Sequence, residues 1–351
     1  MTVVLRVDPL DPDPVLIARA AQCLRDGGLV AFPTETVYGL GVHALDREAV
    51  RRLYLAKGRP AADPLIVHVS ALEDVGRLVS VMPGAVDRLA RRFWPGPLTL
   101  VLPRSSEVPD EVTASLETVA VRIPVHPVAQ ALLRAAAIPV AAPSANLFSR
   151  PSPTQAAHVV EDLDGRIDLV VDGGSTTIGV ESTVLDLTGE TPVILRPGGV
   201  TLEDLREILP EVRAHTAAST GPMRSPGLLE KHYSPRAPLT LYTGEGPAPL
   251  ESLVKDLEEL RRQGAARIGV LIASDERSSL PDHESIVVAD RGPSNRPDIA
   301  AARLYAALRE LDQAGVEQIL ATDVSVQGGL GDALRDRLTR AAAGRIVGVR
   351  R

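Results

Sequence analysis

The sequence predicts an α/β protein of two domains: a first domain with a twisted mixed sheet, then a smaller Rossmann-like domain. A chain of 351 residues is long enough for two cores of ordinary size. Short apolar runs typical of strands recur along the first part, with helical stretches between them at irregular intervals. A segment rich in proline, glycine and small residues then precedes a regular alternation of strands and helices. The predicted limits are 1–212 for the first domain, 213–238 for the linker and 239–351 for the second domain.

The first domain opens with a predicted helix at residues 13–26, because Pro14 suits its first turn and Gly27 can end it. A buried strand follows at 29–32, and the polar, glycine-containing segment 34–41 is not expected to belong to the core. Further strands are predicted at 64–69, 98–102, 119–123, 138–142, 168–172, 180–187 and 193–196. Helices are predicted at 46–57, 71–80, 84–93, 127–137, 154–163 and 201–209.

The second domain alternates strands and helices, which is the basis for predicting a small Rossmann-like sheet. Its strands are predicted at 239–242, 267–273, 285–289, 316–321 and 345–349. Its helices are predicted at 250–263, 297–314 and 331–343.

Composition and charge exclude several classes of protein. Hydrophobic residues make up 44% and charged residues 24%, which is too apolar for a disordered chain. Aromatic residues make up 3%, which argues against a stacking platform for single-stranded nucleic acid. The net charge is −7, and residues 1–210 account for all of it, with 19 basic and 26 acidic side chains. A protein that binds a phosphate backbone over a broad surface would carry the opposite sign, so an anion bound here should lie in a focused pocket.

The single cysteine, Cys23, lies in an apolar helical stretch, and we interpret it as a small buried apolar residue. One cysteine permits neither an intrachain disulfide nor a cysteine-based zinc site. The first residues lack the apolar core of a signal peptide, and charged residues and prolines interrupt the most apolar run, 119–143. We therefore expect a cytoplasmic protein that does not span a membrane.

Several common motifs are absent from the sequence, and each absence removes a class of protein. There is no GxxxxGK[ST] loop, no HExxH pair, no CxxC pair and no GxSxG elbow. Gly39, Gly41 and Ala44 have the spacing of a dinucleotide fingerprint, but no acidic residue in a second strand completes it. These absences disfavour P-loop nucleotide hydrolases, zinc peptidases and α/β-hydrolases.

The sequence also contains five polar clusters, which we place where strands of the predicted sheet end. They are PTETVYG at 33–39, KGRP at 57–60, APSAN at 142–146, ESTV at 181–184 and LRPG at 195–198. Ligands of α/β folds bind at strand ends, where lysine supplies a compact charge for phosphate and arginine a bidentate fork. Only three of the 38 basic residues are lysines, and Lys57 is one of them. The clusters predict a pocket for a polyanionic small molecule such as a nucleotide.

Each of these residues also has a purely structural interpretation. Lys57 could complement the dipole of its helix, and Arg196 could form an ordinary ion pair. Ser144 and Asn146 could be turn residues that satisfy their own backbone, and His68 could be a hydrogen-bonded core histidine. The joint occurrence of the clusters, rather than any one member, favours a binding site.

The ordered series PTETVYGLG, KGRP, FWPGPLTLVL, VAVRIP, APSAN, PSPT, GVESTV and LRPGG resembles that of threonylcarbamoyl-AMP synthases with a YrdC-like domain. The resemblance covers residues 15–210 densely, and SPGLLEKHYSP at 225–235 is similar to the linker of two-domain members. It implies a YrdC-like first domain and a reaction of L-threonine, bicarbonate or CO₂, and ATP that yields threonylcarbamoyl-adenylate and pyrophosphate. The product would serve threonylcarbamoyladenosine modification of tRNA through downstream transferase proteins. Direct contact with tRNA is left open.

The resemblance also implies roles for individual residues. Lys57 and Arg59 are expected to be catalytic, because they would hold the triphosphate and stabilise the leaving pyrophosphate. The implied ATP-binding residues are Lys57, Arg59, Asp63, Thr118, Asn146, Thr154, Arg196 and Tyr233. The implied threonine-binding residues are Thr36, His68, Arg122, Ser144 and Ser182, with Arg122 paired to the carboxylate. Mg²⁺ is expected to bind through the phosphates rather than through a cage of protein carboxylates.

Tyr233, in the linker, is expected to close over the nucleotide, because the carbamate and the mixed anhydride both decompose in water. A plain tether between the domains is the alternative. No catalytic residue is assigned to the second domain.

Two other functions compete with the synthase. A double-stranded RNA-binding module would use a concave YrdC-like surface, but the acidic first domain argues against a broad electrostatic contact. A carbamoyl-transferring hydrogenase-maturation protein would share the YrdC-like domain, but it needs a zinc-finger module that one cysteine cannot build.

Overall fold

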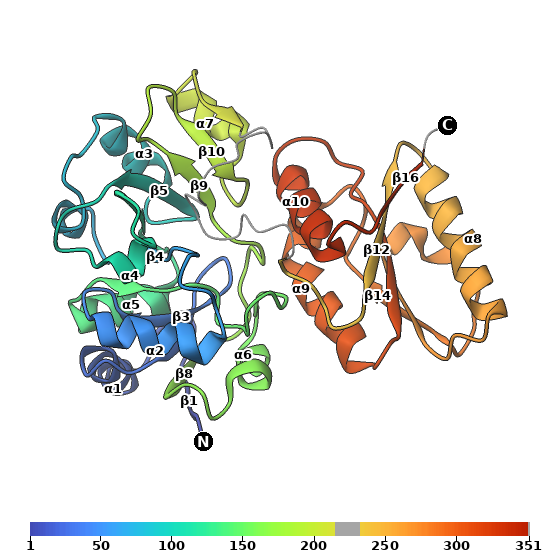
Figure 1. Cartoon of the computed structure of the whole chain (residues 1–351), viewed down its shortest axis with the longest axis horizontal. Coiled ribbons are helices and arrows are strands. Elements are labelled where there is room, and N and C mark those ends of the chain that lie inside the picture. The colour runs from blue at the N-terminus through green and yellow to red at the C-terminus, as the bar shows by residue number, and fades with distance from the viewer. Residues whose placement is uncertain (215–231, 350–351) are drawn as a thin grey trace. The chain divides into compact units, whose positions relative to one another are not determined.

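The computed structural model describes residues 1–214 and 232–349 (Figure 1). The chain divides into two compact units. Unit 1 comprises Met1–Phe148 and Ser152–Leu228, and unit 2 comprises Ser149–Pro151 and Leu229–Arg351. Most of the predicted linker, residues 215–231, lies outside the described residues.

Unit 1 is built on a mixed sheet of eleven described strands, in the order β1-β8-β2-β3-β7-β4-β6-β5-β9-β10-β11. The strands are β1 (Val3–Arg6), β2 (Val30–Pro33), β3 (Tyr38–His43), β4 (Ile66–His68), β5 (Leu98–Pro103), β6 (Thr118–Arg122), β7 (Val140–Ala141), β8 (Leu169–Asp172), β9 (Thr183–Asp186), β10 (Val193–Arg196) and β11 (Arg213–Ala214). In its centre β4 and β6 are parallel, β6 and β5 antiparallel, and β5 and β9 parallel. The prediction of an α/β domain with a mixed sheet is confirmed.

The helices of unit 1 begin and end at residues suited to those positions. They are α1 (Pro14–Arg25), α2 (Arg47–Lys57), η1 (Glu73–Arg77), α3 (Ala85–Phe93), α4 (Asp110–Thr113), α5 (Pro127–Ala136), α6 (Ala156–Leu163) and α7 (Leu202–Ile208). The carboxylates of Asp13 and Asp46 accept hydrogen bonds from the first amides of α1 and α2. Gly58 ends α2 with φ of +62°, a conformation that glycine adopts without strain. The predicted helix at 71–80 is only the short 3₁₀ helix η1.

Helices cover both faces of this sheet. On one face α1 and α5 pack side by side over β2 and β8 (Figure 1). Their cluster includes Leu24, Phe32 and Leu132. On the other face a larger cluster includes Leu53 of α2 and Leu89 of α3. The candidate site lies on the same face of the sheet as α1 and α5, farther along at β4, β6 and β5.

The expectation that segment 34–41 lies outside the core is wrong. Tyr38, Leu40 and Val42 on β3 are completely buried, and β3 pairs with β2 on one side and β7 on the other. The intervening glycines make this close packing possible, since a Cβ on Gly41 would lie 2.8 Å from Phe32. The glycines that suggested a loop in the sequence therefore belong to a buried strand.

Unit 2 contains a parallel sheet of five described strands in the order β14-β13-β15-β12-β16. The strands are β12 (Leu239–Gly244), β13 (Ile268–Ile272), β14 (Ile286–Asp290), β15 (Gln318–Thr322) and β16 (Ile346–Val349). The helices are α8 (Ala248–Arg262), η2 (Ser274–Ser279), α9 (Pro297–Gln313) and α10 (Leu330–Ala342). Helix α8 lies on one side of the sheet, and α9 and α10 lie on the other (Figure 1). No helix in the described part of the chain is both long and apolar enough to span a membrane.

Candidate active site

One face of three neighbouring central strands changes from apolar to polar along its length. Its apolar end is a small cluster to which β4, β6 and β5 contribute Ile66, Ala120 and Val101. His68, Arg122 and Thr99 lie on the same face of the sheet, and each is two residues away from the apolar residue of its own strand. Arg122 is directly opposite His68 on one side and Thr99 on the other, so the three form a row, which we call the polar row. All three are buried.

Arg122 is held by two partners from the turn between β2 and β3. Its Nη1 donates to Thr36 Oγ1 at 2.9 Å, and its Nη2 donates to Glu35 Oε1 at 2.7 Å. The other oxygen of Glu35 accepts from the amide of Val125 at 3.2 Å. The sheet therefore brings two residues predicted to bind threonine, Thr36 and Arg122, into direct contact.

His68 is 3% exposed, and its ring meets the edge of Phe32 with the centroids 6.4 Å apart. Burial, helped by the positive charge of Arg122, lowers the pKa of His68 to about 3. The imidazole is therefore neutral at neutral pH. Its Nδ1 has no hydrogen-bond partner among the described residues.

Ser182, directly before β9, joins the polar row to Arg196. Its Oγ lies 2.8 Å from Thr99 Oγ1 and accepts from Arg196 Nη2 at 3.2 Å. Arg196 also donates to the backbone oxygen of Ser182 from both Nε and Nη2, at 3.2 and 3.0 Å. Gly198 permits this approach, since a Cβ there would lie 2.3 Å from the oxygen of Glu181. The ESTV and LRPG clusters are thus in contact.

Lys57, the last residue of α2, is only 2% exposed. Its Nζ donates to the backbone oxygens of Ser144 and Asn146, each at 2.5 Å. Burial, with Arg59 nearby, lowers the pKa of Lys57 well below its ordinary value. The KGRP and APSAN clusters are therefore also in contact.

Arg59 forms a buried ion pair with Asp63, with Nη2 and Oδ2 2.9 Å apart. Neither carboxylate oxygen of Asp63 has a well-formed hydrogen bond in the described part of the chain. Burial raises the pKa of Asp63, while Arg59, Lys57 and Arg196 act in the opposite direction. Arg59 therefore contacts this carboxylate, and Lys57 and Arg196 are near enough to influence its charge.

The remaining predicted residues differ in their surroundings. Thr118 is half-buried at the start of β6, on the same face as Arg122. Thr154 is buried, and its amide donates to His158 Nδ1 at 3.3 Å. Asn146 is 1% exposed, and its Nδ2 donates to the oxygen of Leu147. Among the described residues, no group of three or more histidine, cysteine, aspartate or glutamate side chains is placed to hold a metal ion.

Tyr233 is the predicted site residue that belongs to unit 2. It is 1% exposed, with φ of +58°, and its ring packs on Tyr305 with the centroids 5.6 Å apart. The guanidinium carbon of Arg337 lies 5.2 Å from the same ring.

Comparison with known proteins covers nearly the whole chain. The family model described as "Telomere recombination" matches residues 22–198, and that of the threonylcarbamoyl-AMP synthase C-terminal domain matches residues 200–343. A threonylcarbamoyl-AMP synthase of Pyrococcus abyssi is 44% identical over 336 residues, which cover 94% of this chain and 95% of that protein. One of Bacillus subtilis is 43% identical over 343 residues, with 97% and 96% covered. The chain belongs to the threonylcarbamoyl-AMP synthase family. The crystal structure of P. abyssi Sua5 complexed with L-threonine superposes with a TM-score of 0.92 at 41% identity, covering 99% of this chain and all of that one.

Two residues of the candidate site, Glu35 and Thr99, were not predicted from the sequence. Glu35 lies within the quoted PTETVYGLG motif, but nothing in the sequence indicates its partner, which comes 87 residues later. Thr99 lies within FWPGPLTLVL, where it is the one polar residue of an otherwise apolar strand. A hydroxyl in a fully buried strand is the signal that could have indicated it, since such a group needs a hydrogen-bond partner.

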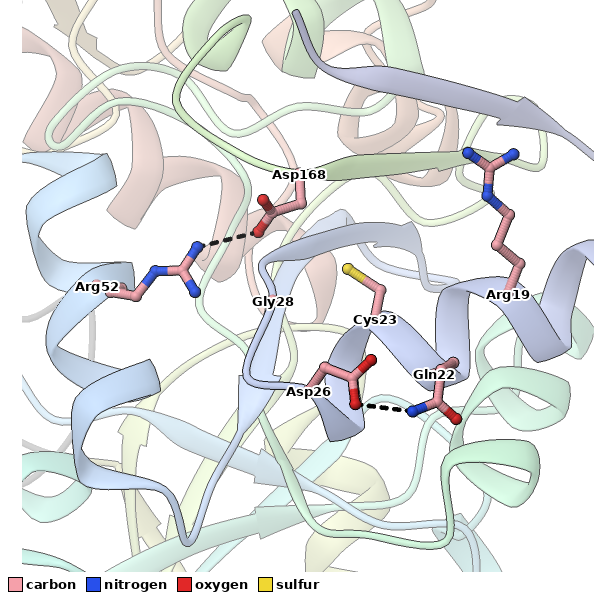
Figure 2. Close-up of a pocket in the computed structure, with 7 residues that line it drawn as sticks. All are labelled: Arg19, Gln22, Cys23, Asp26, Gly28, Arg52 and Asp168. Carbon is pink, nitrogen blue, oxygen red and sulfur yellow. Dashed lines mark hydrogen bonds and ion pairs between the residues drawn. The ribbon is translucent and has the colours of Figure 1, made fainter.

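Unit 1 also has an open pocket of about 570 Å³. None of the residues predicted to bind ATP or threonine lines it. Its lining consists of Arg19, Gln22, Cys23, Asp26, Gly28, Arg52 and Asp168 (Figure 2). Arg52 pairs with Asp168 at 3.3 Å, and burial together with Asp168 raises the pKa of Cys23. Cys23 packs against the α1–α5 cluster but is only half-buried, so the interpretation of it as a buried residue is correct only in part.

Proposed function

We propose that this chain joins L-threonine, bicarbonate or CO₂, and ATP to give threonylcarbamoyl-adenylate and pyrophosphate, for threonylcarbamoyladenosine modification of tRNA. The observation that carries the proposal is the convergence of buried cations in unit 1. Lys57, Arg59 and Arg196 all lower the pKa of Asp63. Arg196 bonds to Ser182, Ser182 bonds to Thr99, and Thr99 lies opposite Arg122 on the sheet. Such an enclosed group of cations suits a triphosphate and a carboxylate bound side by side.

Little covalent work falls to the protein in this reaction. The amine of threonine attacks carbon dioxide with loss of a proton, or bicarbonate with loss of water, to give a carbamate. A carbamate oxygen then attacks the α-phosphorus of ATP and displaces pyrophosphate. The protein must position these groups and stabilise the charge on the leaving pyrophosphate. We assign this catalytic role to Lys57 and Arg59. Arg196, Asn146 and Thr154 would help to hold ATP, and Asp63 and Thr118 would lie near the nucleotide.

For threonine we assign the carboxylate to Arg122, which Glu35 and Thr36 already orient. Ser144 and Ser182 would supply further polar contacts. His68 would bind the substrate by a hydrogen bond rather than accept its proton, because a group with a pKa of about 3 is a weak base.

Mg²⁺ would be held through phosphate oxygens and water, which is how it usually binds with nucleotides. The donor set of unit 1 fits this mode, because the buried carboxylate nearest the cations, Asp63, is engaged by Arg59. When bound, the ion would neutralise part of the charge on the triphosphate.

Other features stay predictions. Tyr233 is assigned to closure over the nucleotide, and unit 2 to a Rossmann-like fold on the strength of its parallel sheet. The downstream partners would be tRNA threonylcarbamoyl transferase proteins, in the cytoplasm.

The decisive measurement is pyrophosphate release from ATP in bicarbonate buffer with and without L-threonine. Release that requires both threonine and bicarbonate is the expected result. Release that is independent of threonine would contradict the proposed function.

A further inference from the structure

We propose that Thr99 is a positioning residue of the threonine site: it fixes the hydroxyl of Ser182 so that the Ser182 proton points to the bound amino acid. This proposal rests on the proposed function, because it takes Ser182 to contact L-threonine. Thr99 is completely buried on β5, whose other residues are apolar. A buried hydroxyl is costly without a partner, and Thr99 Oγ1 finds one in Ser182 Oγ at 2.8 Å.

The sheet topology explains why these two hydroxyls meet although 83 residues separate them. Strand β5 pairs with β6 on one side and β9 on the other, with Thr99 opposite Arg122 and Val184. Ser182 precedes Val184 by two positions and therefore approaches the same face. Thr99 thus lies between Arg122, the assigned partner of the substrate carboxylate, and Ser182.

The hydrogen-bonding capacity of Ser182 determines what Thr99 does. A serine oxygen has two lone pairs and one proton. Arg196 Nη2 donates to one lone pair. Thr99 Oγ1 contacts no other hydrogen-bonding partner in the described part of the chain, so its own proton is available for the second lone pair. The Ser182 proton is then left for an acceptor on the ligand, and L-threonine carries three such oxygens.

The test uses Thr99→Val, which keeps the shape of the side chain and removes its hydroxyl, and Thr99→Ser, which restores the hydroxyl. Thr113→Val is the matched control, because Thr113 is equally buried but bonds to Arg104 on another part of unit 1. Each variant is titrated with L-threonine and with ATP in the pyrophosphate assay. Binding of L-threonine alone is measured by calorimetry, which does not depend on turnover.

Thr99→Val should raise KM for threonine about tenfold, as expected for one lost hydrogen bond, and leave KM for ATP within about twofold. Thr99→Ser should recover most of the loss, and Thr113→Val should match the wild type. An unchanged threonine affinity in Thr99→Val, or equal weakening of both substrates, would overturn the proposal while leaving the proposed function intact. A wild-type protein that neither binds nor consumes threonine would instead overturn the proposed function itself, and the assignment with it.

Discussion

Arg122 and Glu35 form a buried ion pair in unit 1, with 2.7 Å between Nη2 and Oε1 and at most 5% of either side chain exposed. Two unit charges are removed from water there, so each depends on the other. The pair fixes the guanidinium in one orientation before any ligand arrives. We therefore expect Arg122 to have two roles that can be tested separately, one in the stability of unit 1 and one in the binding of threonine.

Arg122→Gln should lower the free energy of unfolding by about 3–5 kcal/mol, because it leaves the Glu35 carboxylate buried without a counter-charge. Adding Glu35→Gln should restore most of that stability, since neither charge remains. Urea unfolding measures this, and titration with L-threonine measures binding. Both variants should bind threonine at least tenfold more weakly than the wild type. Recovery of threonine binding in the double variant would show that Arg122 does not bind the carboxylate.

Lys57→Ala should reduce the rate of pyrophosphate release by about a hundredfold or more, since the charge proposed to stabilise the leaving group is lost. Lys255→Ala is the control, because Lys255 is exposed on α8 of unit 2 and should change the rate less than twofold. Equal effects of the two substitutions would remove Lys57 from the catalytic residues.

The lowered pKa of Lys57 predicts that ATP binding takes up a proton. In the free protein, burial and Arg59 favour the neutral amine, whereas bound phosphate would favour the ammonium and raise its pKa. Between these two pKa values the complex holds more protons than the free protein. ATP affinity should therefore fall as pH rises, by up to about tenfold per pH unit. Calorimetry in buffers of different ionisation enthalpy measures the uptake, and Lys57→Met should abolish it. Uptake that persists in Lys57→Met must come from another group.

Gly198→Ala should damage both stability and activity. Its Cβ would lie 2.3 to 2.5 Å from the backbone of residues 181–183, so the ESTV segment that carries Ser182 must move. We expect a loss of about 1–3 kcal/mol in unfolding free energy, as for other overpacked sites, and a raised KM for threonine. Gly76→Ala is the control, because a Cβ there meets no atom within 4 Å. A Gly198→Ala protein with wild-type stability and KM would show that this turn tolerates displacement.

Tyr233→Ala tests closure over the nucleotide. If the ring excludes water from the adenylate, its loss should slow pyrophosphate release about tenfold and shorten the lifetime of the adenylate. Tyr233→Phe keeps the ring that packs on Tyr305 and should behave nearly as the wild type. Unchanged release and unchanged adenylate lifetime in Tyr233→Ala would favour the plain tether.

Local periodicity in the sequence predicted most of the elements well. The helix at 127–137 and the strand at 98–102 match α5 and β5 within a residue, because caps, prolines and apolar spacing act over a few neighbouring positions. Local signals failed where packing overrides them. The glycines at 39 and 41 suggested a loop, yet their lack of a side chain is what lets β3 lie against Phe32.

The sequence by itself determined that the chain is α/β, that polar clusters end several of its elements, and that its ordered motifs resemble one family. It did not determine which clusters touch. Lys57 meets the 144–146 turn, Glu35 meets Arg122, and Thr99 meets Ser182, across separations of 83 to 89 residues. Those contacts depend on strand order and register, which arise from the burial of whole strand faces rather than from any local pattern. The tertiary structure alone therefore decided that these clusters meet, and that Thr99 lies between Arg122 and Ser182.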